Sequence, residues 1–265
     1  MKSFLFLLLN FSCFGVEIVA HRGASYGAPE NTLPSFNLAW EEDADWIEGD
    51  YLLTKDGEIV CTHDKTTKKF NKENLTIKKS TLKQLKELDF GAWKNEKFKG
   101  TKIPTLQEVI KTIPDGKGIV IELKQGKDIV KPMVDILMRE KINLNQVTVI
   151  CFDSEVIKET EKLLPQVRTQ WLTSFKWDKN KKKMKPDITS ILQTLKECHA
   201  DDLDCQANES VVTKSFVEKL HERGYKLNVW TVNDMQKAIR LKELGVDYIS
   251  TDFPGKLKKA LKVNE

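Results

Sequence analysis

Two pairs of polar residues each share one face of an expected strand. Glu48 and Asp50 lie two apart within one apolar run, and Glu122 and Lys124 lie two apart at the end of another. Alternate side chains of a strand point to the same side, and carboxylates buried there are unfavourable unless they are paired or bind a cation. Three converging carboxylates form the all-oxygen site that Mg2+ or Ca2+ prefers. The residues therefore predict one divalent cation, Mg2+ or Ca2+, bound by Glu48, Asp50 and Glu122. An ion-pair network with Arg22 and Lys124 is the alternative.

Two histidines are expected close to these carboxylates. His21 follows an apolar run and His63 follows another, and each precedes a charged residue. A pair of imidazoles beside a metal-type cluster is typical of general acid and base catalysis, because histidine gains and loses a proton near neutral pH. We expect the other two histidines, His199 at a helix end and His221 on an amphipathic helix, to be surface or structural residues.

Eight short β-rich runs predict the strands that position these side chains. They cover residues 17–20, 46–53, 118–122, 147–151, 167–172, 201–204, 226–230 and 246–250. Amphipathic stretches lie between most of them, at 33–42, 129–139, 155–164, 215–223 and 235–244. Strands that alternate with helices indicate βαβ units and a parallel sheet. Eight units close an α/β barrel of the (β/α)8 TIM type, with active sites at the carboxyl ends of the strands, whereas five or six would form an open doubly wound sheet. The count favours the barrel.

Three segments interrupt this pattern. Asp56-Gly57 between two apolar runs predicts a hairpin at the rim, because so short a link cannot join parallel strands; the returning strand would carry His63 toward the active site. Residues 65–104 are rich in lysine and are interpreted as a small insertion after this hairpin, followed by a helix at 105–111. Residues 176–186 contain six lysines and are interpreted as a solvated loop. A basic lip that attracts an anionic substrate or a membrane is the alternative.

The composition is that of a globular chain with nearly balanced charge. Of 265 residues, 40% are hydrophobic and 31% are charged, and no heptad or Gly-X-Y period occurs, which excludes a disordered, coiled-coil or collagen-like chain. The net charge is +4, from 43 basic and 39 acidic residues. The basic residues lack interleaved aromatics apart from Phe175 and Trp177, so we expect no nucleic-acid partner. The oligomeric state is left open.

The N-terminal apolar run, 4–16, follows Lys2. It is shorter than the ~20 residues that a transmembrane helix needs and fits the core of a signal peptide. We expect residues 1–15 to be removed, so that residues 16–265 form an exported protein, periplasmic or secreted, without a transmembrane segment. Acylation at Cys13 and a buried first helix or strand are the alternatives.

The remaining cysteines divide into two kinds. Cys61 and Cys151 lie inside apolar runs and are expected in the core. Cys198 and Cys205 are seven residues apart and could pair in an oxidising compartment if their geometry allows it.

Short motifs follow one another in a fixed order along the chain. They are His21-Arg22-Gly23-Ala24, Pro29-Glu30-Asn31-Thr32, Glu48-Gly49-Asp50, Lys55-Asp56-Gly57 with His63-Asp64, Ile103-Pro104-Thr105-Leu106, Glu122-Leu123-Lys124, Trp230-Thr231-Val232-Asn233, and Gly245-Val246-Asp247 with Thr251-Asp252 and Pro254. Each is weak alone, but the ordered set, from about Ile18 to Leu257, resembles the glycerophosphodiester phosphodiesterase family. The resemblance implies a barrel enzyme that hydrolyses glycerophosphodiesters to glycerol 3-phosphate and an alcohol, using a bound divalent cation.

The resemblance also implies roles for eight residues. Glu48, Asp50 and Glu122 would be metal ligands, His21 and His63 the general acid and base, Arg22 and Lys124 phosphate-binding residues, and Trp230 part of the substrate pocket. A core aromatic at a strand end is the alternative for Trp230. The chain departs from the family after His63-Asp64, where Lys65-Thr66-Thr67-Lys68-Lys69 stands in place of a common arginine.

Two other functions are compatible with these residues. A phospholipase-type phosphodiesterase acting on lysophospholipids or phosphoinositides would resemble the same barrel and would also use paired histidines. A non-catalytic surface protein that binds a ligand on the same barrel would usually have lost a metal ligand or a histidine, whereas all five positions are occupied here.

Overall fold

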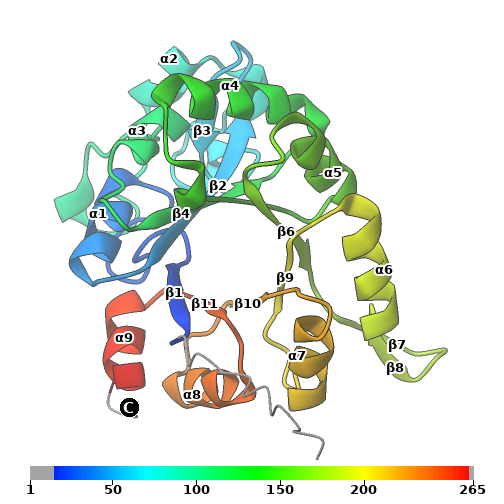
Figure 1. Cartoon of the computed structure of the whole chain (residues 1–265). Helices are drawn as coiled ribbons and strands as arrows, with labels where there is room; N and C mark the ends of the chain where they lie inside the picture. Colours follow the sequence, from blue (N-terminus) through cyan, green and yellow to red (C-terminus); the bar gives the residue numbers. More distant parts are fainter. Residues whose placement is uncertain (1–14, 263–265) are drawn as a thin grey trace, which may run out of the picture.

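Eight parallel strands pair side by side and close on themselves in the computed structural model, which describes residues 15–262 (Figure 1). They are β1 (Glu17–Ala20), β2 (Trp46–Leu53), β4 (Gly118–Leu123), β5 (Val147–Cys151), β6 (Arg168–Thr173), β9 (Asp202–Gln206), β10 (Leu227–Trp230) and β11 (Tyr248–Thr251). Their order is β1-β11-β10-β9-β6-β5-β4-β2, and the pairing of β1 with β2 completes the ring. The predicted (β/α)8 barrel is confirmed.

Helices cover the outside of the barrel between successive strands (Figure 1). They are α1 (Leu33–Glu41), α3 (Leu106–Ile110), α4 (Val130–Glu140), α5 (Ser154–Leu163), α6 (Ile188–Cys198), α7 (Lys214–His221), α8 (Met235–Leu244) and α9 (Pro254–Lys262). Aspartate or threonine side chains cap several helix N-termini, such as Asp153 before α5 and Asp234 before α8, where each accepts a backbone N–H. The amphipathic stretches predicted from the sequence do not include α6 and α9, although His199 was expected at a helix end.

The hydrophobic core has two parts. The larger part lies between the strands and the outer helices and contains the outward-facing residues of each strand, such as Ile47 and Ile121. A smaller cluster of Val19, Ile150 and Leu172 with neighbouring residues fills the barrel interior. Above it, toward the carboxyl ends of the strands, the inward positions become polar.

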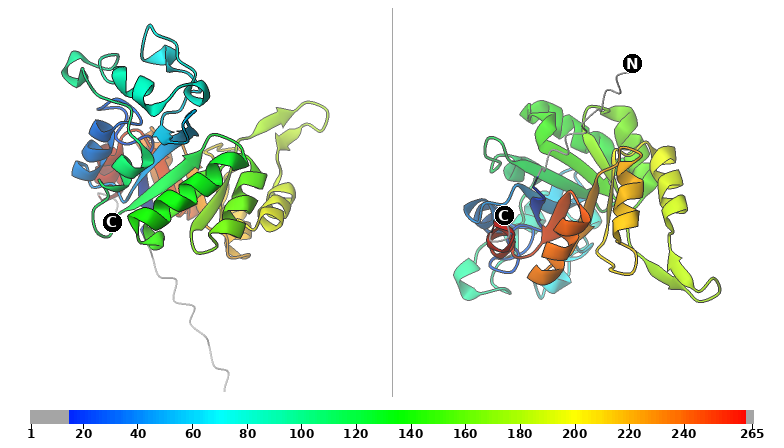
Figure 2. Two further views of the ribbon diagram at one scale, coloured as in Figure 1. Left: turned by 90° about the horizontal axis from the view of Figure 1, so that it is seen from above. Right: turned by 60° about the horizontal axis from the view of Figure 1, so that its bottom comes forward.

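The predicted rim hairpin is present. Strand β3 (Ile59–Cys61) pairs antiparallel with β2, with Tyr51 opposite Cys61. The chain then forms a lobe that contains α2 (Leu82–Glu87) and the short 3-10 helices η1 (Thr67–Lys69), η2 (Ile77–Lys79) and η3 (Glu96–Phe98). This lobe has its own small core around Ile77, Leu85 and Phe90 and stands to one side of the barrel in the left view of Figure 2.

The interpretation of residues 176–186 as a loop was wrong. Strands β7 (Lys176–Asp178) and β8 (Lys183–Lys185) pair antiparallel, with Trp177 opposite Met184. The ribbon extends away from the barrel in both views of Figure 2. Lysine side chains gave no apolar alternation, so the ribbon left no strand signal in the sequence.

The disulfide between Cys198 and Cys205 that the sequence left open is not formed. Cys61, Cys151, Cys198 and Cys205 are all buried free thiols. Cys198 Sγ contacts the carbonyl oxygen of Leu195 within α6 at 3.7 Å, whereas Cys205 lies on β9.

The expected leader, residues 1–15, falls outside the described residues except for Gly15. Within residues 15–262, every helix is too short or too polar to cross a lipid bilayer.

Candidate active site

Three carboxylates from neighbouring strands converge at the carboxyl rim of the barrel. Glu48 and Asp50 point inward from β2 because they are alternate residues. The parallel register pairs Asp50 with Glu122 of β4 and so places the third carboxylate beside them. One oxygen of each side chain lies within 4.8 Å of the others, and Glu48 and Asp50 are only 4% and 1% exposed. The structure therefore brings the predicted ligand set together.

This cluster is electrostatically unfavourable without a cation. Burial raises the pKa of Glu48 well above its usual range, and the charges of Asp50 and Glu122 raise it further. Burial, followed by the charge of Asp50, raises the pKa of Glu122 to about 7 against the opposing effect of Lys124. Among the described residues, Glu48 Oε1 and Asp50 Oδ1 accept no hydrogen bond. Buried carboxylate oxygens without donors fit the ligands of a hard divalent cation.

Two basic side chains flank the carboxylates. Lys124 Nζ lies 2.7 Å from Glu122 Oε1 and 3.4 Å from Asp50 Oδ1, and Arg22 Nε lies 3.2 Å from Asp50 Oδ2. Burial alone would raise the pKa of Asp50, but Arg22 and Lys124 outweigh it and hold that pKa below its usual range. The ion-pair network considered as an alternative from the sequence is thus present together with the three-carboxylate cluster.

Asn31 holds Asp50 in place, a role that the sequence did not reveal. Its Nδ2 donates to Asp50 Oδ2 at 2.8 Å, and its Oδ1 accepts the backbone N–H of Asp50 at 3.0 Å. Asn31 adopts a φ of 57°, in the left-handed region that asparagine enters more readily than most residues. An asparagine in the turn-rich segment after the first strand is the signal that could have identified it.

His21 is held by a carboxylate from the end of the last strand. Its Nδ1 lies 2.7 Å from Asp252 Oδ1, and Asp252 also accepts hydrogen bonds from Asn233 Nδ2 at 2.6 Å and Ser25 Oγ at 3.0 Å. Burial would raise the pKa of Asp252, but His21, Asn233 and Ser25 together lower it to about 2. Asp252 is therefore ionised near neutral pH, and its contact with Nδ1 orients the imidazole ring of His21. The sequence could not predict this pair, because it depends on how β1 closes against β11.

His63 is positioned by the predicted hairpin. Its Nδ1 lies 2.8 Å from Asp64 Oδ1, and the preceding residue, Thr62, donates its backbone N–H to the carbonyl of Asp50 at 2.8 Å. Both His21 and His63 line one cavity of about 160 Å3 together with Glu48, Glu122 and both basic residues of the site.

The other two histidines lie outside this cavity, as expected. His199 is exposed after α6, and His221 bonds Asp247 Oδ2 at 2.9 Å on the outer surface.

Aromatic and acidic residues complete the cavity wall. Trp230, at the end of β10, contacts Phe152 edge-on with ring centroids 5.8 Å apart, and both residues line the cavity. Asp204 of β9 also lines it; burial raises the pKa of Asp204 well above its usual range, and the charge of Glu122 adds to the effect. The sequence placed Asp204 on a strand but gave it no role, because a single aspartate had no partner at a recognisable spacing.

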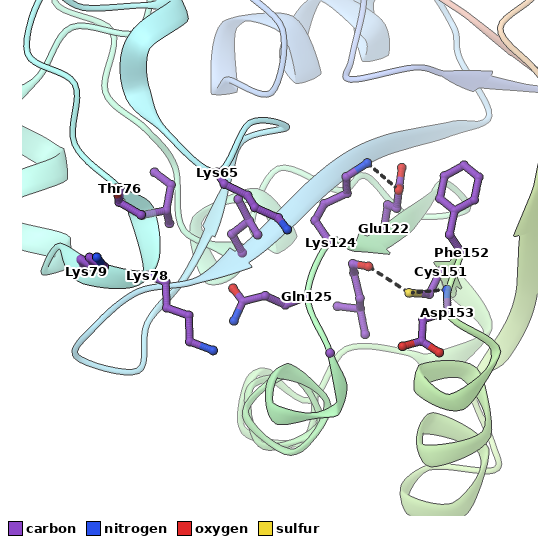
Figure 3. Close-up of a pocket in the computed structure, with 14 residues that line it drawn as sticks. Lys65, Thr76, Lys78, Lys79, Glu122, Lys124, Gln125, Cys151, Phe152 and Asp153 are labelled. Atoms are coloured by element: carbon purple, nitrogen blue, oxygen red, sulfur yellow. Dashed lines mark hydrogen bonds and ion pairs between the residues drawn. The ribbon is translucent and has the colours of Figure 1, made fainter.

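A larger groove, of about 580 Å3, opens from the same site toward the insertion (Figure 3). It shares Glu122, Lys124 and Phe152 with the smaller cavity, so the two adjoin at these residues. Leu52 and Ile77 contribute apolar surface, while the lysines of the insertion that line it are Lys65, Lys78 and Lys79. We call this feature the side groove.

The insertion also contacts the site through Lys69. Its Nζ lies 2.7 Å from Glu30 Oε2, and Glu30 Oε1 lies 3.2 Å from Arg22 Nη1. The segment that lacks the common arginine thus supplies a lysine that shares a carboxylate with Arg22.

Comparisons with known proteins show which family this chain resembles in sequence and in fold. The model of the glycerophosphoryl diester phosphodiesterase family matches residues 21–256. A glycerophosphodiester phosphodiesterase from Caldanaerobacter subterraneus is 31% identical over 241 residues, which cover 89% of this chain and 94% of that protein. One from Bacillus subtilis is 27% identical over 261 residues, covering 92% of this chain and 86% of that protein. A solved phosphodiesterase from Oleispira antarctica, in complex with the product sn-glycerol-3-phosphate, has a TM-score of 0.84 and 27% identity, with 94% of this chain and 98% of that chain covered.

Proposed function

The chain belongs to the glycerophosphoryl diester phosphodiesterase family, and we propose that it hydrolyses glycerophosphodiesters to glycerol 3-phosphate and an alcohol. The observation that carries this proposal is the single cavity lined by two histidines, two basic residues and two carboxylates of the buried cluster. Family membership and the solved relative that holds sn-glycerol-3-phosphate support it.

In this proposal Glu48, Asp50 and Glu122 hold one divalent cation. The cation, when bound, supplies positive charge that neutralises the phosphodiester and stabilises charge developing at phosphorus. Asp50 and Glu30 fix the guanidinium of Arg22, and Glu122 and Asp50 fix the ammonium of Lys124. Both groups are thereby positioned to donate hydrogen bonds to the non-bridging phosphate oxygens.

The two histidines divide the proton transfers. One removes a proton from the nucleophile, which is water or a hydroxyl of the substrate glycerol, and the other protonates the departing alkoxide. Attack by the glycerol hydroxyl would give a cyclic diester, which water must then open to yield glycerol 3-phosphate. Asp252 stabilises the protonated form of His21 by accepting from Nδ1. Asp64 makes the equivalent contact with His63.

A metal-stripping assay tests this function. Metal-free protein is mixed with glycerophosphocholine, Mg2+ and Ca2+ are added back separately, and glycerol 3-phosphate is measured. Product that requires one of the cations is the expected result, and it would identify the metal. Absence of product with both cations, for glycerophosphocholine and for a panel of other deacylated diesters, would contradict the proposal and would favour a non-catalytic binding protein on the same barrel.

The side groove favours a second candidate, action on lysophospholipids. Leu52, Ile77, Leu123 and Phe152 give this groove an apolar lining, and Phe152 also lines the catalytic cavity. Such a lining suits an acyl chain better than a small polar alcohol. A substrate panel that compares deacylated diesters with lysophospholipids separates the two functions.

A further inference from the structure

The two segments that project from the catalytic rim hold an excess of positive charge. Residues 65–104, the insertion, contain twelve lysines and four carboxylates, a net charge of +8. Residues 176–187, the β7–β8 ribbon with its flanks, contain six lysines and two carboxylates, a net charge of +4. Because the whole chain has a net charge of only +4, the remaining residues have a net charge of −8. Although the overall charge is nearly balanced, positive and negative charges are therefore strongly separated along the chain.

Both segments leave the barrel at the same end. The insertion follows the hairpin at the carboxyl end of β2, and the ribbon follows the carboxyl end of β6. Parallel barrel strands have their carboxyl ends on one rim, which here is the rim that holds the carboxylate cluster. The left view of Figure 2 shows the insertion and the ribbon extending from the molecule in different directions from that rim.

Exposed aromatic side chains lie on this rim and on the two segments that leave it. Among the described residues, the large hydrophobic side chains with the most exposure include four aromatics: Tyr26, Trp93, Phe152 and Trp177, which are 62%, 36%, 47% and 59% exposed. Tyr26 follows β1, Phe152 follows β5, Trp93 belongs to the insertion and Trp177 to the ribbon. The two aliphatic ones, Met138 and Leu163, lie instead at the C-terminal ends of α4 and α5.

We propose that the insertion and the β7–β8 ribbon form a docking face for the surface of an anionic lipid membrane, with the catalytic cavity facing the lipid. Tryptophan and tyrosine prefer the boundary between headgroups and acyl chains, and lysines around them are attracted to anionic headgroups. Trp177 and Met184 form a cross-strand pair on the ribbon, so one apolar pair is surrounded by lysines. This arrangement brings lipid-derived diesters directly to the rim where the cavity opens.

The charge on the ribbon is only partly neutralised within the protein. Asp187 pairs with Lys183 at 2.8 Å and with Lys185 at 2.6 Å. Within the described part of the chain, Lys176, Lys179 and Lys181 form no ion pair with a carboxylate. A nucleic acid is disfavoured as the partner because a single tryptophan on the ribbon provides no row of stacking platforms.

Vesicle co-sedimentation of the full chain tests the proposal. One set of vesicles contains phosphatidylcholine alone, and the other contains equal parts of phosphatidylcholine and phosphatidylglycerol. We expect binding to the anionic vesicles only, decreasing as salt is added. A triple variant, Lys176→Gln with Lys179→Gln and Lys181→Gln, should bind the anionic vesicles about a hundredfold more weakly. Each of the three lysines is expected to contribute about equally to the attraction toward the anionic surface. Trp177→Ala should weaken it as well.

A matched variant controls for total charge and for the N-terminal apolar run, which all variants share. Lys158, Lys196 and Lys214 are exposed on α5, α6 and α7, and their replacement by Gln removes the same charge elsewhere. The proposal predicts that this variant retains binding. Equal losses of binding in both triple variants would overturn the proposal in favour of general attraction to polyanions. The same conclusion would follow if Trp177→Ala changed neither the binding to vesicles nor the binding to heparin. Hydrolysis of a soluble diester should be unchanged in the ribbon variants, so the result is independent of whether the proposed reaction is correct.

Discussion

At the residue scale, His21 and His63 each contact an aspartate, but the two aspartates differ in exposure and in their own hydrogen bonds. Asp252, the partner of His21, is 28% exposed and is itself held by Ser25 and Asn233, whereas Asp64, the partner of His63, is 45% exposed. Because a buried and fixed carboxylate stabilises an imidazolium more than a solvated one does, the two histidines should respond differently to loss of their partners.

Replacement of either histidine tests the proposed proton transfers. His21→Ala or His63→Ala should each lower kcat by ~10^2 or more, because general acid and base catalysis contributes about that much. The melting temperature should change little, since both side chains line a cavity. Near-normal turnover in steady-state assays would remove that histidine from the mechanism.

Asp252→Asn separates positioning from direct catalysis. Asparagine keeps the shape of the side chain but removes the charge that stabilises protonated His21, so kcat should fall by about tenfold or more. Asp64→Asn is the matched control, and an equal effect of the two substitutions would contradict the stronger hold on His21.

Asp204 should give the stability of the protein a pH dependence. Its pKa is raised in the folded state, chiefly by burial, so the folded protein binds a proton that the unfolded chain releases above pH ~4. Stability is thus lost as the pH rises from about that value toward the folded pKa. Asp204→Asn, which cannot ionise, should raise the melting temperature more at pH 8 than at pH 5. A uniform change across that range would show that the effect has another cause.

At the element scale, the register of β2 against β4 places all three carboxylates. Trp46 and Gly118 face each other at the start of this register, and a Cβ atom at residue 118 would overlap the Trp46 ring. Glycine at residue 118 therefore leaves room for the Trp46 ring beside β4. The same register continues to Asp50 opposite Glu122.

Gly118→Ala should accordingly lower the free energy of unfolding by about 1–3 kcal/mol, the usual cost of overpacking. Urea denaturation followed by tryptophan fluorescence measures the change. Gly126→Ala is the control, because a Cβ atom there would have only Asp128 Oδ1 within reach, at 3.8 Å. A comparable loss in both variants would show that the Trp46 contact is not the cause.

The elements that could be predicted from the sequence are those whose pattern follows from burial. The barrel strands are apolar on both faces in most positions, and the inward carboxylates Glu48 and Asp50 were identifiable because they break that pattern two residues apart. The β7–β8 ribbon was not predictable, because only the Trp177–Met184 pair is apolar. Asn31 and Asp252 were missed because their partners are set by tertiary closure, which local spacing does not encode.

At the scale of the whole molecule, a bound cation should stabilise the barrel. A ligand that binds only the folded state adds about 2.7 kcal/mol at a hundred times its dissociation constant. Addition of the preferred cation to metal-free protein should therefore raise the melting temperature measured by scanning calorimetry.

The variant Glu48→Gln gives the sharper test of the site. It replaces a buried carboxyl group whose pKa is raised by burial and by its neighbours. Because the amide cannot ionise in this unfavourable environment, the metal-free variant should melt higher than the metal-free wild type. The same change removes a ligand, so the cation should raise its melting temperature less. A variant that keeps the full cation response would exclude Glu48 from the metal site.

The pairing of the first barrel strand with the last one also determines when the active site can form during biosynthesis. Strand β1 pairs along its whole length with β11, from Glu17 opposite Tyr248 to Ala20 opposite Thr251, and His21 meets a partner 231 residues later in the chain. A ribosome releases the first strand long before the last one is made. The active site is therefore absent from every nascent chain and forms only after synthesis of the C-terminal strand.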